Sequence, residues 1–143
     1  VGTNSRLDEI QAAILRVKLP RLDADNARRA EIAGIYDQAL AGTGLALPAR
    51  RAEGTHVFHL YVVRTRDRET VRRQLANAGV AAGIHYPVSV HRQPAYSEYA
   101  PPRGSLPETD RAAEEVLSLP MYPELEDGQI EQVVRALQCG VAA

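Results

Sequence analysis

The sequence predicts a small α+β fold, in which a long kinked N-terminal helix precedes a short-stranded sheet with helices on one face. Three observations support this prediction. Apolar residues recur at helical spacing from about residue 7 to residue 40. A run of β-branched, aromatic and aliphatic residues follows at 56–64. Helical and extended patterns then alternate toward the end of the chain, which is typical of a layer of helices on a sheet.

The first predicted helix runs from about residue 7 to residue 40 and bends near Pro20. Ile10, Ile14 and Val17 fall at positions i, i+4 and i+7, so they form one apolar stripe. Pro20 lacks an N–H group and its ring collides with the preceding turn, so we expect a kink there rather than a straight rod. Gly42 favours the end of the helix.

The start of this helix has the features of an anion-binding turn. Asn4 and Ser5 are both good N-cap residues, and Ser5 with Asp8 resembles a capping box. A helix N-terminus offers free N–H groups and the positive end of the helix dipole to an anion. Gly2 permits a tight turn, and Arg6 adds a positive charge. The residues alone leave two interpretations open, an ordinary capped helix and a phosphate-binding turn.

The rest of the chain divides into short elements of both kinds. The pattern predicts strands over 56–64, 80–86 and 117–121, helices over 67–78, 106–116 and 127–137, and an irregular surface loop over 87–106. Asp67 is the expected N-cap of the second helix, and Gly79 its terminator. Pro87 keeps Tyr86 extended. Asp127 is the expected cap of the last helix.

The composition is that of a soluble globular protein, with 45% hydrophobic residues and a formal net charge of −1. This charge gives no electrostatic basis for binding nucleic acid or an anionic membrane, and no apolar run is long enough to cross a bilayer. Cys139 is the single cysteine, so no internal disulfide is possible, which fits a cytoplasmic protein. The chain opens on Val1, inside a motif, so we expect it to be a segment of a longer protein.

Ordered sequence blocks span nearly the whole chain. The first is Gly2-x-Asn4-x-Arg6-Leu7-Asp8-x-x-Gln11-Ala12-Ala13, and Asn26-x-x-Arg29 follows it. Next come His56-Val-Phe-His-Leu-Tyr-Val-Val-Arg64 and Gly83-Ile-His-Tyr-Pro87, and the last is Leu117-Ser-Leu-Pro-Met-Tyr-Pro123. Together, and in this order, the blocks resemble the DegT/DnrJ/EryC1/StrS family of sugar aminotransferases, which use pyridoxal 5'-phosphate (PLP).

The resemblance implies an architecture and an activity. Residues 1–45 would be the long helix linking to a large PLP domain, and residues 46–143 the small C-terminal α+β domain of fold-type I PLP transferases. The implied reaction moves an amino group from an amino acid, expected to be glutamate, to a nucleotide-linked keto-sugar in polysaccharide or antibiotic sugar biosynthesis. The resemblance also implies a homodimer with shared active sites.

The resemblance further implies which residues contact the cofactor and the substrate. Asn4 corresponds to an asparagine that reaches the PLP phosphate of the neighbouring subunit, and Arg6 is expected to help hold the same anion. His85, Tyr86 and His91 flank the proline-rich loop and are expected to contact the nucleotide-sugar. The resemblance places none of the catalytic residues in this segment.

Lys18 is the only lysine of the chain. PLP enzymes need a lysine amine that forms a Schiff base with the cofactor. In the family this lysine lies upstream of Gly2, whereas Lys18 falls within an amphipathic helix. We therefore expect Lys18 to cover the helix surface, and we expect the segment alone to be inactive.

Four histidines between residues 56 and 91 invite a metal interpretation, which the spacing disfavours. His56 and His59 lie three apart on a predicted strand, so their side chains would point to opposite faces. No cysteine lies nearby to complete a zinc site. We expect no metal site, and we expect His59 to lie in the sheet beside Tyr61 and Val63.

The sequence leaves two alternative functions open. The first is a PLP-dependent sugar dehydratase of the same family, in which a histidine replaces the lysine. The second is a non-catalytic binding or dimerisation module. The residue at the upstream lysine position distinguishes the two enzymes, and a start codon directly before Val1 would indicate the module.

Overall fold

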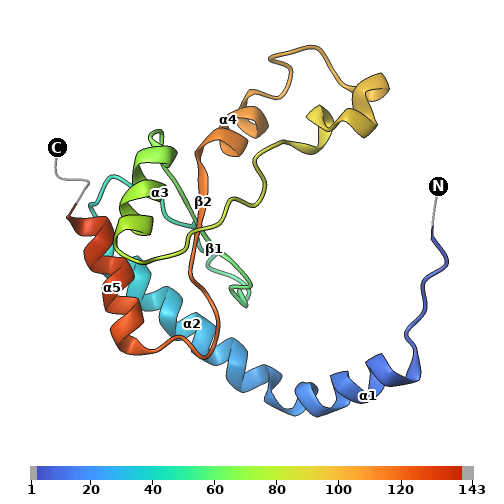
Figure 1. The fold of residues 1–143 in the computed structure, drawn as a ribbon, viewed down its shortest axis with the longest axis vertical. Coiled ribbons are helices and arrows are strands. Elements are labelled where there is room, and N and C mark those ends of the chain that lie inside the picture. The colour runs from blue at the N-terminus through green and yellow to red at the C-terminus, as the bar shows by residue number, and fades with distance from the viewer. Residues whose placement is uncertain (1–2, 140–143) are drawn as a thin grey trace.

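Five helices and two short strands make up the part of the chain that the computed structural model describes, residues 3–139. The helices are α1 (Glu9–Lys18), α2 (Leu22–Ala39), α3 (Arg68–Asn77), α4 (Pro107–Glu115) and α5 (Asp127–Gln138). The strands are β1 (Tyr61–Arg64) and β2 (Val116–Leu119), and short 3₁₀ helices lie at Leu19–Arg21, Val90–Arg92 and Pro94–Tyr99. The predicted α+β class with a long N-terminal helical segment is confirmed (Figure 1).

The predicted bend near Pro20 is confirmed, but the helix begins later than predicted. A 3₁₀ helix containing Pro20 separates α1 from α2, because proline cannot complete the α-helical bond pattern. Asp8, not Asn4 or Ser5, is the N-cap of α1, and its carboxylate accepts a hydrogen bond from the Gln11 N–H at 2.8 Å. The negative charge of this carboxylate also interacts favourably with the positive end of the helix dipole. Asp8 is therefore the N-cap in preference to Ser5, whose hydroxyl is uncharged.

The hydrophobic core lies between α2, α3, α5 and the two strands. The second half of α2 buries Ile32, Ala33 and Tyr36, whereas α1 buries no residue. The remaining helices contribute apolar faces at helical spacing, from Val71 and Leu75 of α3 and from Ile130, Val133, Ala136 and Leu137 of α5. The apolar stripe predicted for the first helix is exposed, with 76% of Ile10 and 77% of Val17 accessible.

The sheet has two antiparallel strands, in which Tyr61 pairs with Leu119 and Val63 pairs with Leu117. The predicted strand over 56–64 is therefore too long at its start. Phe58 has a φ of 48°, and its N–H donates to His56 Nδ1 at 2.9 Å. A left-handed residue cannot continue an extended ladder, and the side-chain bond uses the N–H that a partner strand would need.

The predicted strand over 80–86 is wrong. Only Gly83 pairs with the sheet, through an isolated bridge to Ser118. Ala81, Ala82 and Gly83 have low strand propensity and little side chain to pack, so the segment does not extend this bridge into a ladder. An analogous bridge joins Ala46 to Arg64 on the other side of the sheet.

The later helices follow the sequence closely. Asp67 caps α3 by accepting from the Thr70 N–H, and Pro107 occupies the first turn of α4, both as predicted. The cap of α5 is Glu126 rather than Asp127, because Glu126 and Gln129 form a reciprocal capping box. The predicted strand over 117–121 is confirmed as β2, shifted toward the N-terminus by one or two residues.

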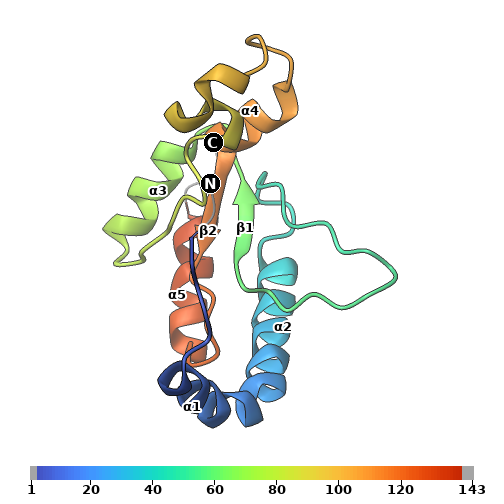
Figure 2. The same ribbon diagram turned by 90° about the vertical axis from the view of Figure 1, so that its right-hand side faces the viewer.

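Two parts of the chain project from this core at opposite ends. Figure 2 shows α4 and the adjoining 3₁₀ segment at one end of the molecule and α1 at the other. The segment over 87–106 contains two 3₁₀ helices within the predicted irregular loop. Among residues 3–139, no helix combines the length and hydropathy needed to cross a membrane.

Candidate functional site

The two residues expected to contact the cofactor, Asn4 and Arg6, lie in the segment before α1. Both side chains are exposed. Figure 1 shows this segment standing apart from the sheet and from the helices that pack on it. Gly2, the first residue of the motif, lies outside the described residues. The chain therefore does not bring Asn4 and Arg6 together with His85, Tyr86 and His91 within one molecule.

His85 and Tyr86 form an exposed aromatic pair at the sheet edge. Their ring centroids lie 5.6 Å apart in an edge-to-face arrangement, and 73% of Tyr86 is accessible. Such a pair offers a flat apolar surface with polar atoms at its rim, which suits a sugar or a base. Both residues follow Gly83, whose backbone is bonded to β2, so the sheet positions the pair.

Ser118 lies behind this pair and was not predicted to have a functional contact. Its hydroxyl oxygen lies 2.9 Å from Nδ1 of His85, and the residue is buried, with 4% accessible. The contact joins residues 33 apart in sequence. The sequence predicts a structural role for the serine within the Leu117–Pro123 block. No neighbouring residue in the sequence indicates that this serine is the partner of His85.

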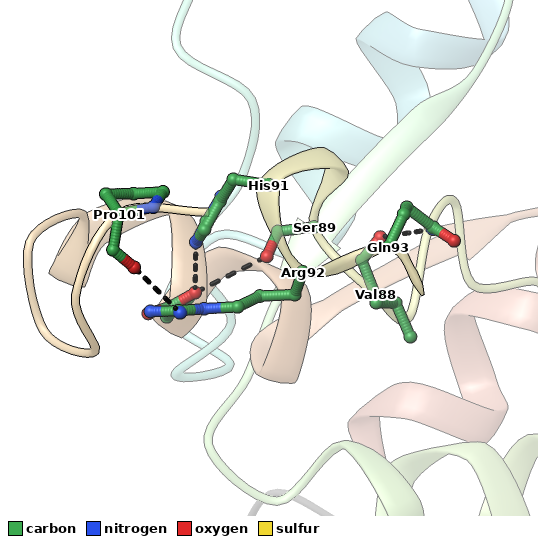
Figure 3. A network of polar contacts seen from close by, with 7 residues as sticks. Val88, Ser89, His91, Arg92, Gln93 and Pro101 are labelled. Carbon is green, nitrogen blue, oxygen red and sulfur yellow. Dashed lines mark hydrogen bonds and ion pairs between the residues drawn. The ribbon is translucent and has the colours of Figure 1, made fainter. Parts of the chain in front are cut away.

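A network of polar contacts joins His91 and its neighbours in the loop to Asp110 of α4. Its Nε2 lies 3.0 Å from Oδ1 of Asp110, and Arg92 donates to Oδ2 of the same carboxylate at 3.2 Å. The Ser89 hydroxyl donates to Oδ1 at 3.4 Å, and Arg92 also donates to the Pro101 carbonyl at 3.2 Å. Figure 3 shows these side chains of the loop converging on one group.

This network gives His91 a structural contact in addition to the substrate role proposed from the sequence. A carboxylate only accepts hydrogen bonds, so Nε2 of His91 must carry the hydrogen that joins it to Asp110. The hydrogen bond from Arg92 lowers the pKa of the Asp110 carboxyl. The charged carboxylate is therefore the form that ties the 88–101 segment to α4.

Replacement of Asp110 by alanine is expected to loosen this segment without unfolding the core. The amide hydrogens of Arg92 and Gln93, which bond within the 3₁₀ helix, should exchange with solvent several-fold faster, while those of α5 keep their protection. Hydrogen exchange monitored by NMR measures both. Glu108→Ala, which removes an exposed pair with Arg111 on the same helix, is the control and should leave the exchange unchanged. Equal exchange in wild type and Asp110→Ala would contradict the assignment.

The same contact predicts a pH dependence. A carboxyl whose folded pKa is lowered stabilises the fold above its unfolded pKa, and this stabilisation is lost as the pH falls through the folded value. The protection of Arg92 and Gln93 should therefore persist from neutral pH to the ordinary carboxyl range and disappear below it. Loss of protection well above that range, with Asp110 still charged, would contradict the prediction.

The other histidines and the lysine have simpler surroundings. His56 packs on Phe58, with ring centroids 4.3 Å apart, and His59 lies exposed in the loop before β1, so its predicted place in the sheet is wrong. β1 begins only at Tyr61, so His59 precedes the strand. Lys18 is exposed on α1. Among residues 3–139, no cluster of three or more His, Cys, Asp or Glu side chains is placed to hold a metal ion.

Comparisons with known proteins match the chain over almost its full length. The family model for the DegT/DnrJ/EryC1/StrS aminotransferase family matches residues 1–138. The dTDP-3-amino-3,4,6-trideoxy-alpha-D-glucose transaminase of Streptomyces venezuelae is 47% identical over 138 residues, which are 96% of this chain and 36% of that protein.

Solved structures give the same result. The crystal structure of S. venezuelae DesV in complex with a ketimine intermediate superposes with a TM-score of 0.95 at 45% identity, covering 99% of this chain and 38% of that one. The Bacillus subtilis protein ntda, solved with bound cofactor PMP, has a TM-score of 0.85 at 28% identity, covering 99% of this chain and 34% of that one. The chain thus spans little more than a third of the length of these relatives. It belongs to the DegT/DnrJ/EryC1/StrS aminotransferase family.

Proposed function

We propose that this chain is the C-terminal part of a PLP-dependent enzyme that transfers an amino group from an amino acid to a nucleotide-linked keto-sugar. The proposed amino donor is glutamate. The observation that carries the proposal is the family match over residues 1–138, joined to the close superposition on DesV. Transaminases of nucleotide-linked amino sugars are among the relatives. In this proposal residues 1–45 link to a large domain, and residues 46–143 form the small domain.

The residues before α1 fit the phosphate of the cofactor by their chemistry. Asn4 offers amide donors and Arg6 a guanidinium, and both are exposed. Asp8 and Glu9 occupy the helix N-terminus, so Asn4 and Arg6 would hold the phosphate, rather than the helix end itself. Bound PLP would supply an aldehyde carbon that accepts and returns the amino group, and a ring that acts as an electron sink. Lys18 has no part in this, and the Schiff-base lysine belongs to residues outside this chain.

The separation of Asn4 from His85 supports an active site shared between two subunits. In this arrangement the segment before α1 reaches the cofactor of the partner, while His85 and Tyr86 contact the sugar nucleotide. The exposed stripe of Ile10, Ile14 and Val17 fits a surface that packs on another part of the assembly, because isolated exposure of this much apolar area is unfavourable.

The first test is the reading frame upstream of Val1 in the gene. The proposal expects the frame to continue for a few hundred codons, with a lysine codon shortly before Gly2. The product of that frame should release 2-oxoglutarate from glutamate and aminate a dTDP-linked keto-sugar. A histidine codon in place of the lysine codon would favour the sugar dehydratase. A start codon directly before Val1, with no reading frame upstream of it, would favour a non-catalytic module.

The phosphate assignment is tested in the same protein by replacing Arg6 or Asn4 with alanine. A hydrogen bond to a charged group contributes about 1.5–3 kcal/mol, so each change should raise the Kd for PLP by roughly 10- to 100-fold. Fluorescence titration of the cofactor measures this, with the oligomeric state checked by light scattering. Arg66→Ala is the matched control, because Arg66 is exposed in the turn after β1. Unchanged PLP affinity in both variants would overturn the assignment.

A further inference from the structure

The contact between Ser118 and His85 depends on a third residue, Gly83, which lies against both. Gly83 and Ser118 exchange backbone hydrogen bonds, with the Gly83 N–H donating to the Ser118 carbonyl at 3.0 Å and the Ser118 N–H donating to the Gly83 carbonyl at 2.7 Å. The His85 ring folds back over this bridge, and its Nδ1 meets the Ser118 hydroxyl at 2.9 Å. The sheet therefore fixes both ends of the side-chain bond.

Gly83 makes this position of the ring possible. A Cβ atom built on Gly83 would lie 2.7 Å from Cε1 of His85, closer than real Cβ contacts allow. The histidine ring is the movable partner, so a side chain at residue 83 would push the ring away from Ser118. The backbone of Gly83 does not have a positive φ, so the glycine is needed for space rather than for its backbone conformation.

The direction of the hydrogen bond follows from the burial of Ser118. A hydroxyl has one hydrogen to donate, and a buried donor without an acceptor costs about 1–3 kcal/mol. Within residues 3–139, His85 Nδ1 is the one partner that the Ser118 hydroxyl has. The hydroxyl therefore donates to Nδ1, and the ring hydrogen of neutral His85 is left on Nε2.

We propose that Ser118 and Gly83 are positioning residues, which hold the neutral ring of His85 in the tautomer whose Nε2–H donates to an oxygen acceptor of the bound substrate. A hydroxyl or carbonyl oxygen of a sugar satisfies this donor, whereas a ligand ammonium does not. The inference rests on the proposed function for the identity of the ligand. The tautomer of His85 is determined by residues of this chain, so it is tested without a ligand.

His91 provides an internal contrast. Its Nε2–H is used by Asp110, so it has no such donor free for a ligand. Tyr86, which meets His85 edge to face, is 73% accessible. The pair of His85 and Tyr86 thus offers one fixed donor and one rotatable hydroxyl at the exposed edge of the sheet.

The experiment is NMR of the ¹⁵N-labelled protein above pH 8, where imidazole is neutral, with ring nitrogens read through their couplings to the ring protons. His85→Gln identifies the signals of His85. The expected result is an Nδ1 shift characteristic of an unprotonated, hydrogen-bonded nitrogen and an Nε2 shift characteristic of a protonated one. A protonated Nδ1 in the wild-type chain would overturn the proposal.

Two variants test, in different ways, whether Ser118 and Gly83 determine the tautomer of His85. Ser118→Ala removes the hydroxyl, and Gly83→Ala displaces the ring while leaving the hydroxyl in place. Both should move the two ring ¹⁵N shifts of His85 toward each other, as expected for a mixture of tautomers, while amide signals of α5 stay in place. Ser105→Ala, at an exposed serine, and Gly34→Ala, where an added Cβ meets no atom within 4 Å, are the matched controls.

The outcomes separate this inference from the proposed function. Ring shifts that are identical in wild type, Ser118→Ala and Gly83→Ala would overturn the positioning role, whatever the enzyme does. If one variant fails to fold, as judged from the α5 amides, the other decides the question. A fixed Nε2–H tautomer in a protein that shows no transaminase activity would leave the positioning role intact and would reject the proposed reaction.

Discussion

Replacement of Tyr36 by alanine is expected to destabilise the chain by about 3–5 kcal/mol, a large share of the stability of a domain of this size. Tyr36 is fully buried on α2, and its ring centroid lies 5.0 Å from that of Tyr61 on β1. Its hydroxyl donates to the Pro120 carbonyl at 3.0 Å, beyond the end of β2. One side chain thus joins the long helix to both strands. Chemical denaturation followed by circular dichroism measures the change.

Two further substitutions separate the ring from the hydroxyl. Tyr36→Phe keeps the packing and loses one hydrogen bond, so it should cost only about 0.5–1.5 kcal/mol. Tyr99→Ala is the exposed control, because 80% of Tyr99 is accessible, and it should change stability by less than about 0.5 kcal/mol. A loss in Tyr36→Ala no larger than that in Tyr36→Phe would show that α2 does not depend on this ring.

Local signals predicted the helices well. Asp67 and Gly79 bracket α3 in the sequence as they do in the structure, and Pro20 breaks the first helix where the sequence places the break. These features act within one or two turns, so a single sequence contains the information needed. The N-cap of α1 was misplaced because Asn4, Ser5 and Asp8 are all capable caps, and the selection among them depends on competition rather than on residue type.

The strands were predicted less well, because a strand is defined by its partner. Phe58 has strand propensity, yet its N–H bonds to His56 and its backbone is left-handed. The segment at 80–86 has only one bridge to β2, through Gly83. Neither fact follows from residue types, since both depend on which backbone groups the neighbouring segments occupy.

The candidate site shows the same division. Motif resemblance selected His85, Tyr86 and His91, and the structure adds the partners that the sequence did not reveal. Ser118 lies 33 residues from His85, and Asp110 lies 19 residues from His91. Serine and aspartate are common in β-edge and helix surface positions, so no spacing rule joins them to a histidine. Only the folded chain brings the two pairs together.

Alkaline unfolding is the second large expected effect, and it arises from the same buried tyrosines. Burial raises the pKa of Tyr36, and burial together with the hydrogen bond to Asp37, at 2.6 Å, raises the pKa of Tyr61. A raised folded pKa means that the stabilisation is complete below the unfolded pKa, near 10, and is lost as the pH rises above it. Each tyrosine then costs about 1.4 kcal/mol per pH unit.

The two tyrosines together should remove about 5 kcal/mol of stability between pH 10 and pH 12, enough to unfold a marginally stable domain. In the ultraviolet absorbance of tyrosinate, the contributions of Tyr36 and Tyr61, which are both fully buried, should appear only with unfolding. Tyr61→Phe should halve the pH dependence, because it removes one of the two groups that must ionise. Stability that stays constant to pH 12, or ionisation of Tyr36 and Tyr61 before the chain unfolds, would mean that the core does not shield these two rings from water.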